Sequence, residues 1–324
     1  MSDLAIWRFV VLSSMAWQRE TFKKIKQIPR EEHVFPGTSL CAGCGGLEAL
    51  RLAAKVLGDD VVYVNAAGCF TTLAAYPFTP FKGSWLYTTM GSAPAGAQGL
   101  RDALDVLIAK GRLPEHENLK VVVLGGDGST YDMALSSTSG AVSRKLDFYY
   151  FCYDNEAYGN TGAQLSPATP YGARTTTTPC SLQHPAGTMQ EKKDIFEIWR
   201  AHKPPYIATV APRYPLDLEE KFARAAAFTG PKLFLALSAC PTGWLYDPGE
   251  TPEVAKLAVE TGLWPLKEAI NGAVTHTYIP KRKPVEEYLK LQGRFRHLFE
   301  PTKQEDAIRH IQDRVDAYWD AIKG

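Results

Sequence analysis

The sequence lacks both a long apolar run and an excess of charge of one sign. No stretch approaches about 18 uninterrupted apolar residues, so no membrane span is predicted. The 36 basic and 35 acidic residues leave a net charge of +1, which gives no reason to expect nucleic acid or an anionic membrane surface as a partner. No secretory signal is evident, because Arg8 interrupts the apolar stretch from Leu4 to Trp17.

Cysteine is also scarce. Six cysteines in 324 residues are too few for a disulfide scaffold at this length. The expected location is therefore the cytoplasm, where a Cys-x-x-Cys pair indicates a metal or redox site more often than a disulfide.

The chain divides into three predicted parts. Residues 1–32 form an N-terminal extension or docking arm, with Lys23, Lys24 and Lys26 in a short basic helical piece, and residues 281–324 form a helical tail. Between them, residues 33–280 alternate between predicted strands and predicted helices. Strands are predicted over 61–65, 119–124, 148–153, 206–210 and 232–237, and helices over 45–57, 95–109, 133–144, 195–202 and 216–227.

This alternation predicts an α/β fold, a parallel sheet with helices on both faces. Ligands of such sheets bind beyond the carboxyl ends of the strands. The long polar segment over 159–185 carries no predicted element, and a segment of that kind inside a compact domain is usually functional.

Two predicted strands end in residues suited to a diphosphate and a divalent cation. In Gly126-Asp127-Gly128, the glycines allow close approach of a ligand, and the following helix offers N–H groups to an anion. Asp127, the side chain of Asn155 and the carbonyl of Ala157 can supply the oxygen ligands that Mg²⁺ prefers. Asp127 could instead cap a helix in a tight turn. A dinucleotide site is excluded, since no Gly-x-Gly-x-x-Gly fits at Gly126.

Four cysteines fall in predicted loops at strand ends or helix starts, where they could meet. Cys41 and Cys44 precede the first helix, a position that favours thiolate, while Cys69 and Cys240 each follow a strand. A tetrathiolate cage suits either zinc or an iron–sulfur cluster, and the residues alone do not decide between them. Of the other two cysteines, Cys152 is expected in the core of a strand, and Cys180 lies in a loop with no evident partner.

The two sites together resemble the thiamine-diphosphate-binding β subunit of the 2-oxoacid:ferredoxin oxidoreductases, over about residues 33–300. The matching segments are Cys41-Ala42-Gly43-Cys44-Gly45, Cys69, Gly126-Asp127-Gly128, Asn155-Glu156-Ala157-Tyr158-Gly159-Asn160-Thr161-Gly162 and Cys240-Pro241-Thr242-Gly243-Trp244. The resemblance implies a thiamine-diphosphate-binding fold and one [4Fe–4S] cluster on the four cysteines. It also implies Mg²⁺ on Asp127, Asn155 and Ala157, further cofactor contacts from Gly45, Gly126 and Gly128, and a catalytic position for Asn160.

The activity implied by the resemblance is oxidative decarboxylation of a 2-oxoacid to acyl-CoA and CO₂, with electrons leaving through the cluster to ferredoxin or a similar acceptor. Pyruvate, branched-chain and aryl 2-oxoacids all fit. The sequence lacks a Cys-x-x-Cys-x-x-Cys run for onward electron transfer, and no second thiamine half-site stands out. The resemblance therefore implies α- and γ-type subunits and a ferredoxin-like cluster subunit. The alternatives are a non-oxidative thiamine enzyme with structural zinc, or a non-catalytic electron-transfer subunit.

Some features depart from the family pattern or fall outside its motifs. Some members carry Glu after the Cys-Gly, where this chain has Gly46. His33, His184 and His202 lie in no recognisable motif, so a surface or structural role is expected for each.

Overall fold

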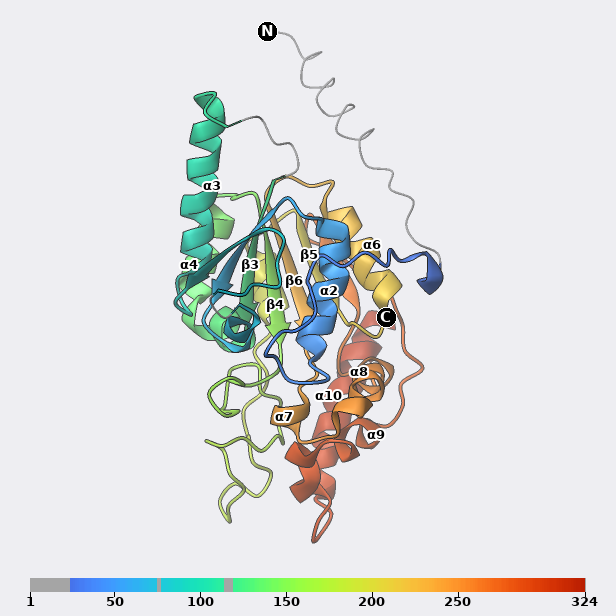
Figure 1. The fold of residues 1–324 in the computed structure, drawn as a ribbon. Helices are drawn as coiled ribbons and strands as arrows, with labels where there is room; N and C mark the ends of the chain where they lie inside the picture. The colour runs from blue at the N-terminus through green and yellow to red at the C-terminus, as the bar shows by residue number, and fades with distance from the viewer. Residues whose placement is uncertain (1–23, 75–76, 114–118, 324) are drawn as a thin grey trace.

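The computed structural model describes residues 24–74, 77–113 and 119–323. An eight-stranded sheet runs through this part of the chain in the order β2-β1-β3-β4-β6-β5-β7-β8 (Figure 1). The first six strands are mutually parallel, and β7 and β8 add an antiparallel hairpin at one edge. The predicted α/β fold is therefore confirmed. The strands are β1 Val61–Ala66, β2 Ser84–Thr88, β3 Lys120–Gly126, β4 Phe148–Asp154, β5 Tyr206–Val210, β6 Pro231–Leu237, β7 Lys267–Ile270 and β8 Ala273–His276.

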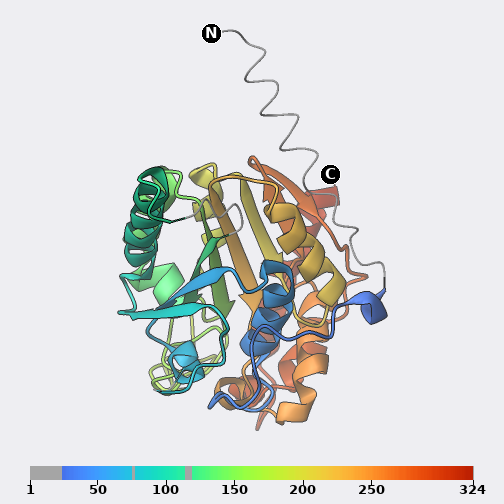
Figure 2. The same cartoon turned by 45° about the horizontal axis from the view of Figure 1, so that its top comes forward.

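Helices cover both faces of the sheet (Figure 2). On one face, α2 and α6 pack against an apolar layer that includes Tyr149, Phe222 and Phe234. The other face carries α3, α4 and α5 together with the C-terminal helices α8, α9 and α10. The helices are α2 Gly45–Leu57, α3 Ala93–Ala109, α4 Leu135–Ser143, α5 Ile195–Ala201, α6 Pro215–Ala225, α7 Pro241–Trp244, α8 Thr251–Glu260, α9 Val285–Lys290 and α10 Glu305–Lys323.

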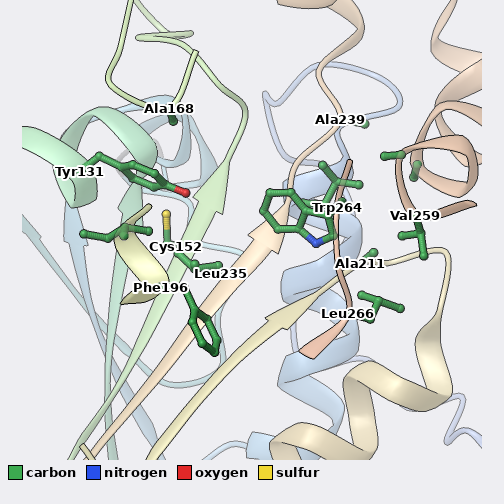
Figure 3. Packing of buried hydrophobic residues seen from close by; sticks show 14 of the residues in the cluster. Tyr131, Cys152, Ala168, Phe196, Ala211, Leu235, Ala239, Val259, Trp264 and Leu266 are labelled. Atoms are coloured by element: carbon green, nitrogen blue, oxygen red, sulfur yellow. The ribbon is translucent and has the colours of Figure 1, made fainter. Parts of the chain in front are cut away.

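The central strands are buried on both faces, as their β-branched and aromatic sequences predict. Every residue of β4 and β6 is buried. Cys152 is fully buried in β4 beside Leu235 and Phe196, which confirms it as a core residue (Figure 3). The register pairs Gly126 of β3 with Tyr153 of β4. These two strands consequently end side by side, and the residues that follow them can meet.

The predicted elements match the structure closely over the central strands and less well elsewhere. The expected helix over 133–144 is preceded by a π-helical turn, Ser129–Met133, which follows the end of β3 almost directly. The strands β2, β7 and β8 and the helix α8 were not predicted. The polar segment over 159–185 has no helix, and only an isolated bridge joins Gln164 to Tyr158.

Both ends of the described chain pack against the body. The predicted N-terminal extension is described only from residue 24, so its part over 1–23, including Lys23, lies outside the described residues. Ile25–Gln27 forms a short 3₁₀ turn, and Lys55 of α2 donates hydrogen bonds to the carbonyls of Pro29 and Glu31 at 2.8 and 2.7 Å. At the other end, α9 and α10 bury Leu289 and Trp319 against the sheet. None of the described helices is long and apolar enough to cross a membrane.

Candidate functional site

Three oxygen atoms converge where β3 and β4 end. The carboxamide oxygen of Asn155 lies 2.8 Å from Oδ1 of Asp127 and 2.8 Å from the carbonyl oxygen of Ala157. The backbone N–H of Asn155 also donates to Oδ1 of Asp127, at 3.3 Å. The three residues predicted as Mg²⁺ ligands are therefore brought together by the adjacent strand ends.

The spacing of these oxygens fits a small divalent cation. Around Mg²⁺ with ligands at 2.0–2.1 Å, neighbouring oxygens of an octahedron lie about 2.9 Å apart. If the Asn155 carboxamide were turned over, its NH₂ group would donate to both oxygens without an ion. Its oxygen would then face the sulfur of Cys69, which now accepts from Nδ2 of Asn155 at 3.6 Å. With its oxygen toward Asp127 and Ala157, the Asn155 side chain would join these residues as a third oxygen ligand of a bound cation.

Asp127 is only 1% exposed. Burial, followed by the carboxylate of Asp154, raises the pKa of Asp127 well above its ordinary value. Ser166 donates a hydrogen bond to Oδ2 and offsets part of this effect. A buried carboxylate with so few compensating donors is a suitable ligand for a cation, whose charge reverses the cost of ionisation.

A buried group of ion pairs holds the segment that carries Asn155 and Ala157, two of the predicted Mg²⁺ ligands. Glu156 lies between Asn155 and Ala157 with φ of 60°, a left-handed conformation that non-glycine residues seldom adopt. Its carboxylate accepts from Lys192 at 3.0 Å and from Arg294 at 2.7 Å. Burial alone would raise the pKa of Glu156, but these two cations outweigh burial and lower it. We call Glu156, Lys192 and Arg294 the ion-pair clamp.

The clamp also reaches the loop that follows β6. The indole N–H of Trp244 donates to the carbonyl of Asn155 at 2.8 Å, and the guanidinium of Arg294 lies 3.8 Å from the centre of an indole ring of the same tryptophan. Because Trp244 ends α7, which begins directly after Cys240, the cysteine-bearing loop and the Asn155 segment are fixed to each other.

The four candidate cysteines lie in loops around this point. Cys44 caps the start of α2, Cys240 precedes α7, and Cys69 begins the 3₁₀ turn Cys69–Leu73. The N–H of Gly45 donates to the carbonyl of Ala239 at 3.1 Å, which joins the loops of Cys44 and Cys240. Cys41 is exposed at the edge of the group.

The electrostatics of the thiols differ from the expectation that the helix start favours thiolate. Burial raises the pKa of Cys44 to about 11, although the N–H of Leu47 acts in the opposite direction. Burial, then Cys240 and Cys44, raise the pKa of Cys69 to about 12. Desolvation and mutual repulsion therefore outweigh the helix N-terminus at Cys44. Such thiols ionise when a cation compensates their charge, as a metal centre does.

Glycines make room for this arrangement. A Cβ on Gly159 would lie 2.8 Å from Nδ2 of Asn155 and 3.3 Å from the sulfur of Cys69. A Cβ on Gly46 would lie 2.6 Å from Oγ of Ser238 and 3.2 Å from Cβ of Tyr153, so a side chain at this position would require its neighbours to shift. Gly45 is buried, and its N–H is already bonded to Ala239.

The remaining predicted residues lie at or beyond the margin of the site. Asn160 is exposed on the polar segment, and its side chain makes no hydrogen bond within the described chain. A Cβ on Gly128 would meet the ring of Tyr158 at 2.2 Å, so that ring covers Gly128. Cys180 is exposed and unpaired.

The histidines take structural or surface positions. His33 pairs with Asp59 at 2.6 Å, and His202 lies 2.7 Å from the hydroxyl of Ser139. His184 is exposed on a loop.

Sequence and structure comparisons identify similar proteins. Residues 66–235 match the family described as thiamine pyrophosphate enzyme, C-terminal TPP binding domain. Pyruvate synthase subunit PorB of Methanocaldococcus jannaschii is 42% identical over 90% of this chain and 97% of its own length. Ketoisovalerate oxidoreductase subunit VorB of Pyrococcus furiosus is 37% identical over 94% and 96%. A 2-oxoglutarate:ferredoxin oxidoreductase structure from Magnetococcus marinus covers 75% of this chain and 83% of its own, with TM-score 0.51 and 21% identity, which supports the fold.

Proposed function

The chain belongs to the thiamine-diphosphate-binding β subunits of the 2-oxoacid:ferredoxin oxidoreductases, and from that premise we propose how its residues serve oxidative decarboxylation. Pyruvate is the first substrate to test, because the pyruvate synthase subunit is 42% identical and the ketoisovalerate subunit 37% identical. The proposed products are the acyl-CoA and CO₂, with electrons leaving through a cluster bound by this chain.

Asp127, Asn155 and the carbonyl of Ala157 are the proposed ligands of a Mg²⁺ ion that holds the diphosphate. The observation that carries this proposal is that the Asn155 carboxamide lies 2.8 Å from both Oδ1 of Asp127 and the carbonyl oxygen of Ala157. The start of the helical turn after Gly126-Asp127-Gly128 adds backbone N–H groups for the phosphate oxygens. When bound, thiamine diphosphate supplies the carbanion chemistry that cleaves a 2-oxoacid beside its oxo carbon.

The cysteines are the proposed ligands of a [4Fe–4S] cluster. Four thiolates around one zinc ion, each at about 2.3 Å, would place their sulfurs about 3.8 Å apart. Among the described residues, the only group of three or more His, Cys, Asp and Glu ligand atoms within 4.8 Å of one another is Glu31, His33 and Asp59. The thiols are thus close enough to perturb one another's pKa but too widely spaced for a single zinc ion, which favours a larger inorganic core.

Asn155 is the proposed junction between the two centres. Its carboxamide oxygen faces the Mg²⁺ ligands, while its Nδ2 donates to the sulfur of Cys69 at 3.6 Å. One side chain therefore sets the distance between the diphosphate anchor and the nearest cluster ligand. Hydrogen bonds to cluster sulfurs also influence reduction potential.

Other subunits are proposed to complete the site. The edge strand β2 exposes Leu86 and Tyr87, and Met133 is exposed at the end of the π-helical turn. Apolar side chains exposed beside a functional site favour a protein partner. We assign this surface to an α-type subunit that carries the second thiamine half-site, with γ-type and ferredoxin-like subunits continuing the electron path. The isolated chain should therefore not reduce an acceptor when substrate is added.

The test uses the assembled complex, purified without oxygen. We expect thiamine diphosphate after acid release, iron and sulfide in the β subunit, and visible absorption that bleaches with dithionite. Asp127→Ala should lose the thiamine diphosphate and keep the iron, whereas Cys69→Ala should lose iron. The matched controls Asp102→Ala and Cys180→Ala alter exposed residues of the same types and should change neither content.

The substrate is tested on the same preparation with coenzyme A and pyruvate, 2-oxoisovalerate or phenylpyruvate. Zinc in place of iron, or iron that Cys69→Ala leaves unchanged, would refute the cluster assignment. Thiamine diphosphate retained in full by Asp127→Ala would refute the Mg²⁺ site.

A further inference from the structure

A cavity of about 300 Å³ lies between the sheet and the C-terminal helices. Its floor is formed by side chains of β5, β6 and β7, and its walls come from α5, α9 and α10. Figure 3 shows four of its lining residues, Tyr131, Phe196, Leu235 and Trp264. None of the proposed Mg²⁺ or cluster ligands lines it, but Glu156 and Lys192 of the ion-pair clamp do. The cavity is thus next to the cofactor site and separate from it.

Lys267 is the distinctive residue of this cavity. It begins β7 and is 7% exposed. Its ammonium group makes no hydrogen bond or ion pair with any described residue. It lies over two aromatic rings: Nζ is 4.2 Å from the ring centre of Phe196 and 5.3 Å from that of Tyr318. Burial lowers the pKa of Lys267, and the carboxylates of Asp194 and Glu197 act in the opposite direction.

The other cations around the cavity already have partners. Lys192 pairs with Asp154 at 2.8 Å and with Glu156 at 3.0 Å. Lys193 donates to the carbonyl of Tyr131 at 2.6 Å. His310 and Arg314 both pair with Glu191, at 2.6 and 3.1 Å. Lys267 is therefore the lining lysine whose ammonium has no direct ion pair or hydrogen bond within the described part of the chain, although the carboxylates of Asp194 and Glu197 act on it from further away.

A buried ammonium without a counter-ion is costly, and contact with aromatic faces recovers only about 0.5–2 kcal/mol of that cost. The lining combines apolar side chains, among them Leu235, Trp264 and Phe295, with polar ones next to Lys267, namely Asp194 and Thr209. A ligand that complements both features carries one negative charge and an apolar body. Its volume must suit a cavity at the lower end of the range for small-molecule sites.

We propose that this cavity is a second ligand site, which binds a small organic monocarboxylate with an aromatic or branched apolar body. The carboxylate pairs with Nζ of Lys267, and the apolar body lies against Phe196, Tyr318 and Trp264. This site goes beyond the proposed function, because its ligand does not reach the diphosphate anchor. Lys192 and Glu156 form part of the wall, so occupancy also bears on the segment that carries Asn155.

The test measures phenylacetate binding to the assembled complex by calorimetry, with uncharged phenylacetamide as the matched ligand. We expect phenylacetate to bind and phenylacetamide to bind about tenfold more weakly or not at all, because only phenylacetate pairs with the ammonium. Lys267→Met should lose phenylacetate binding, and Lys267→Arg should retain part of it. Lys193→Met, which alters a lining lysine that already has a backbone partner, should bind phenylacetate normally.

Asp127→Ala separates this site from the cofactor site, since it should leave phenylacetate binding intact. Loss of binding in Asp127→Ala with retention in Lys267→Met would place the ligand at the cofactor site and overturn the proposal. Equal binding of phenylacetate and phenylacetamide would also overturn it. So would a Lys267→Met complex that assembles, melts at a higher temperature and binds phenylacetate as the wild type does, because Lys267 would then be only a buried charge. Failure of the thiamine assays would refute the proposed function and leave these outcomes unaffected.

Discussion

Replacing Arg294 by Met should weaken the binding of Mg²⁺ and thiamine diphosphate without touching either directly. The guanidinium group is buried, donates to Glu156 at 2.7 Å and to Gln292 at 2.8 Å, and covers the Trp244 ring. Met keeps much of the apolar contact and removes the charge. Glu156 would then rely on Lys192 alone, in a segment whose φ of 60° requires outside support.

The size of the effect follows from the buried pair. Removing one partner of a buried ion pair costs about 3–5 kcal/mol, and the remaining Lys192 should bring this to the lower end. Loss of a residue that orients a metal ligand lowers metal affinity by about 10–100-fold. We therefore expect the apparent Kd for thiamine diphosphate, measured by equilibrium dialysis of the complex at fixed Mg²⁺, to rise within that range.

A double-mutant cycle tests whether Arg294 acts through Glu156. Glu156→Gln and Arg294→Met should each raise the Kd, and the double variant should lose less than the sum of the two free-energy changes. Arg296→Met is the matched control, because Arg296 lies two residues further along and is exposed. Full additivity in the cycle, or an equal effect of Arg296→Met, would refute the idea that the clamp positions the metal-binding segment.

Two further changes test other parts of the structure. Both carboxylate oxygens of Glu219 are buried without a hydrogen-bond partner in the described chain, and burial raises its pKa from 4.5 to about 7. Between pH 4.5 and pH 7 the folded protein therefore binds more protons than the unfolded chain, so its stability falls as the pH rises through this range. Glu219→Gln should stabilise the complex by about 1–3 kcal/mol above pH 7 and have no effect near pH 4. Equal gains in melting temperature at both pH values would contradict this prediction. Gly159→Ala should lower iron content, because its methyl group would displace Asn155 from Cys69, and unchanged iron with unchanged thiamine diphosphate would show that the segment absorbs the methyl group freely.

The central strands were predictable because both of their faces are buried, so nearly all of their side chains are apolar. Val121-Val122-Val123 in β3 and the aromatic run in β4 leave no polar face, so apolar content alone marks them. The edges gave no such signal. In β2, three of five residues are exposed, and in β8, three of four. Edge strands are stabilised by pairing with a neighbour, which local composition does not report.

The meeting of the proposed metal-binding residues was predictable for a topological reason. Parallel neighbouring strands end at one edge, so residues directly after two of them must lie close together. The residues that hold them in place had no comparable signal. Arg294 is 138 positions from Glu156, in a part of the sequence read only as a helical tail, and nothing in that tail indicates which buried carboxylate it meets. The one local hint was Glu156 itself, an acidic residue between two proposed ligands.

The expectation for the cysteine thiols was wrong at Cys44 for a related reason. A helix start lowers a thiol pKa when the thiol stays near solvent, but desolvation and the neighbouring thiols of Cys240 and Cys41 raise the pKa of Cys44. Burial depends on the whole fold, and here it raises a thiol pKa that the helix start alone would lower. As proposed ligands of a metal centre, these thiols would lose their protons only when the bound metal compensates their charge. Asn155 lies 86 positions from Cys69 and donates to its sulfur. Because Asn155 is also a proposed Mg²⁺ ligand, its carboxamide is one of the contacts that join the two proposed centres.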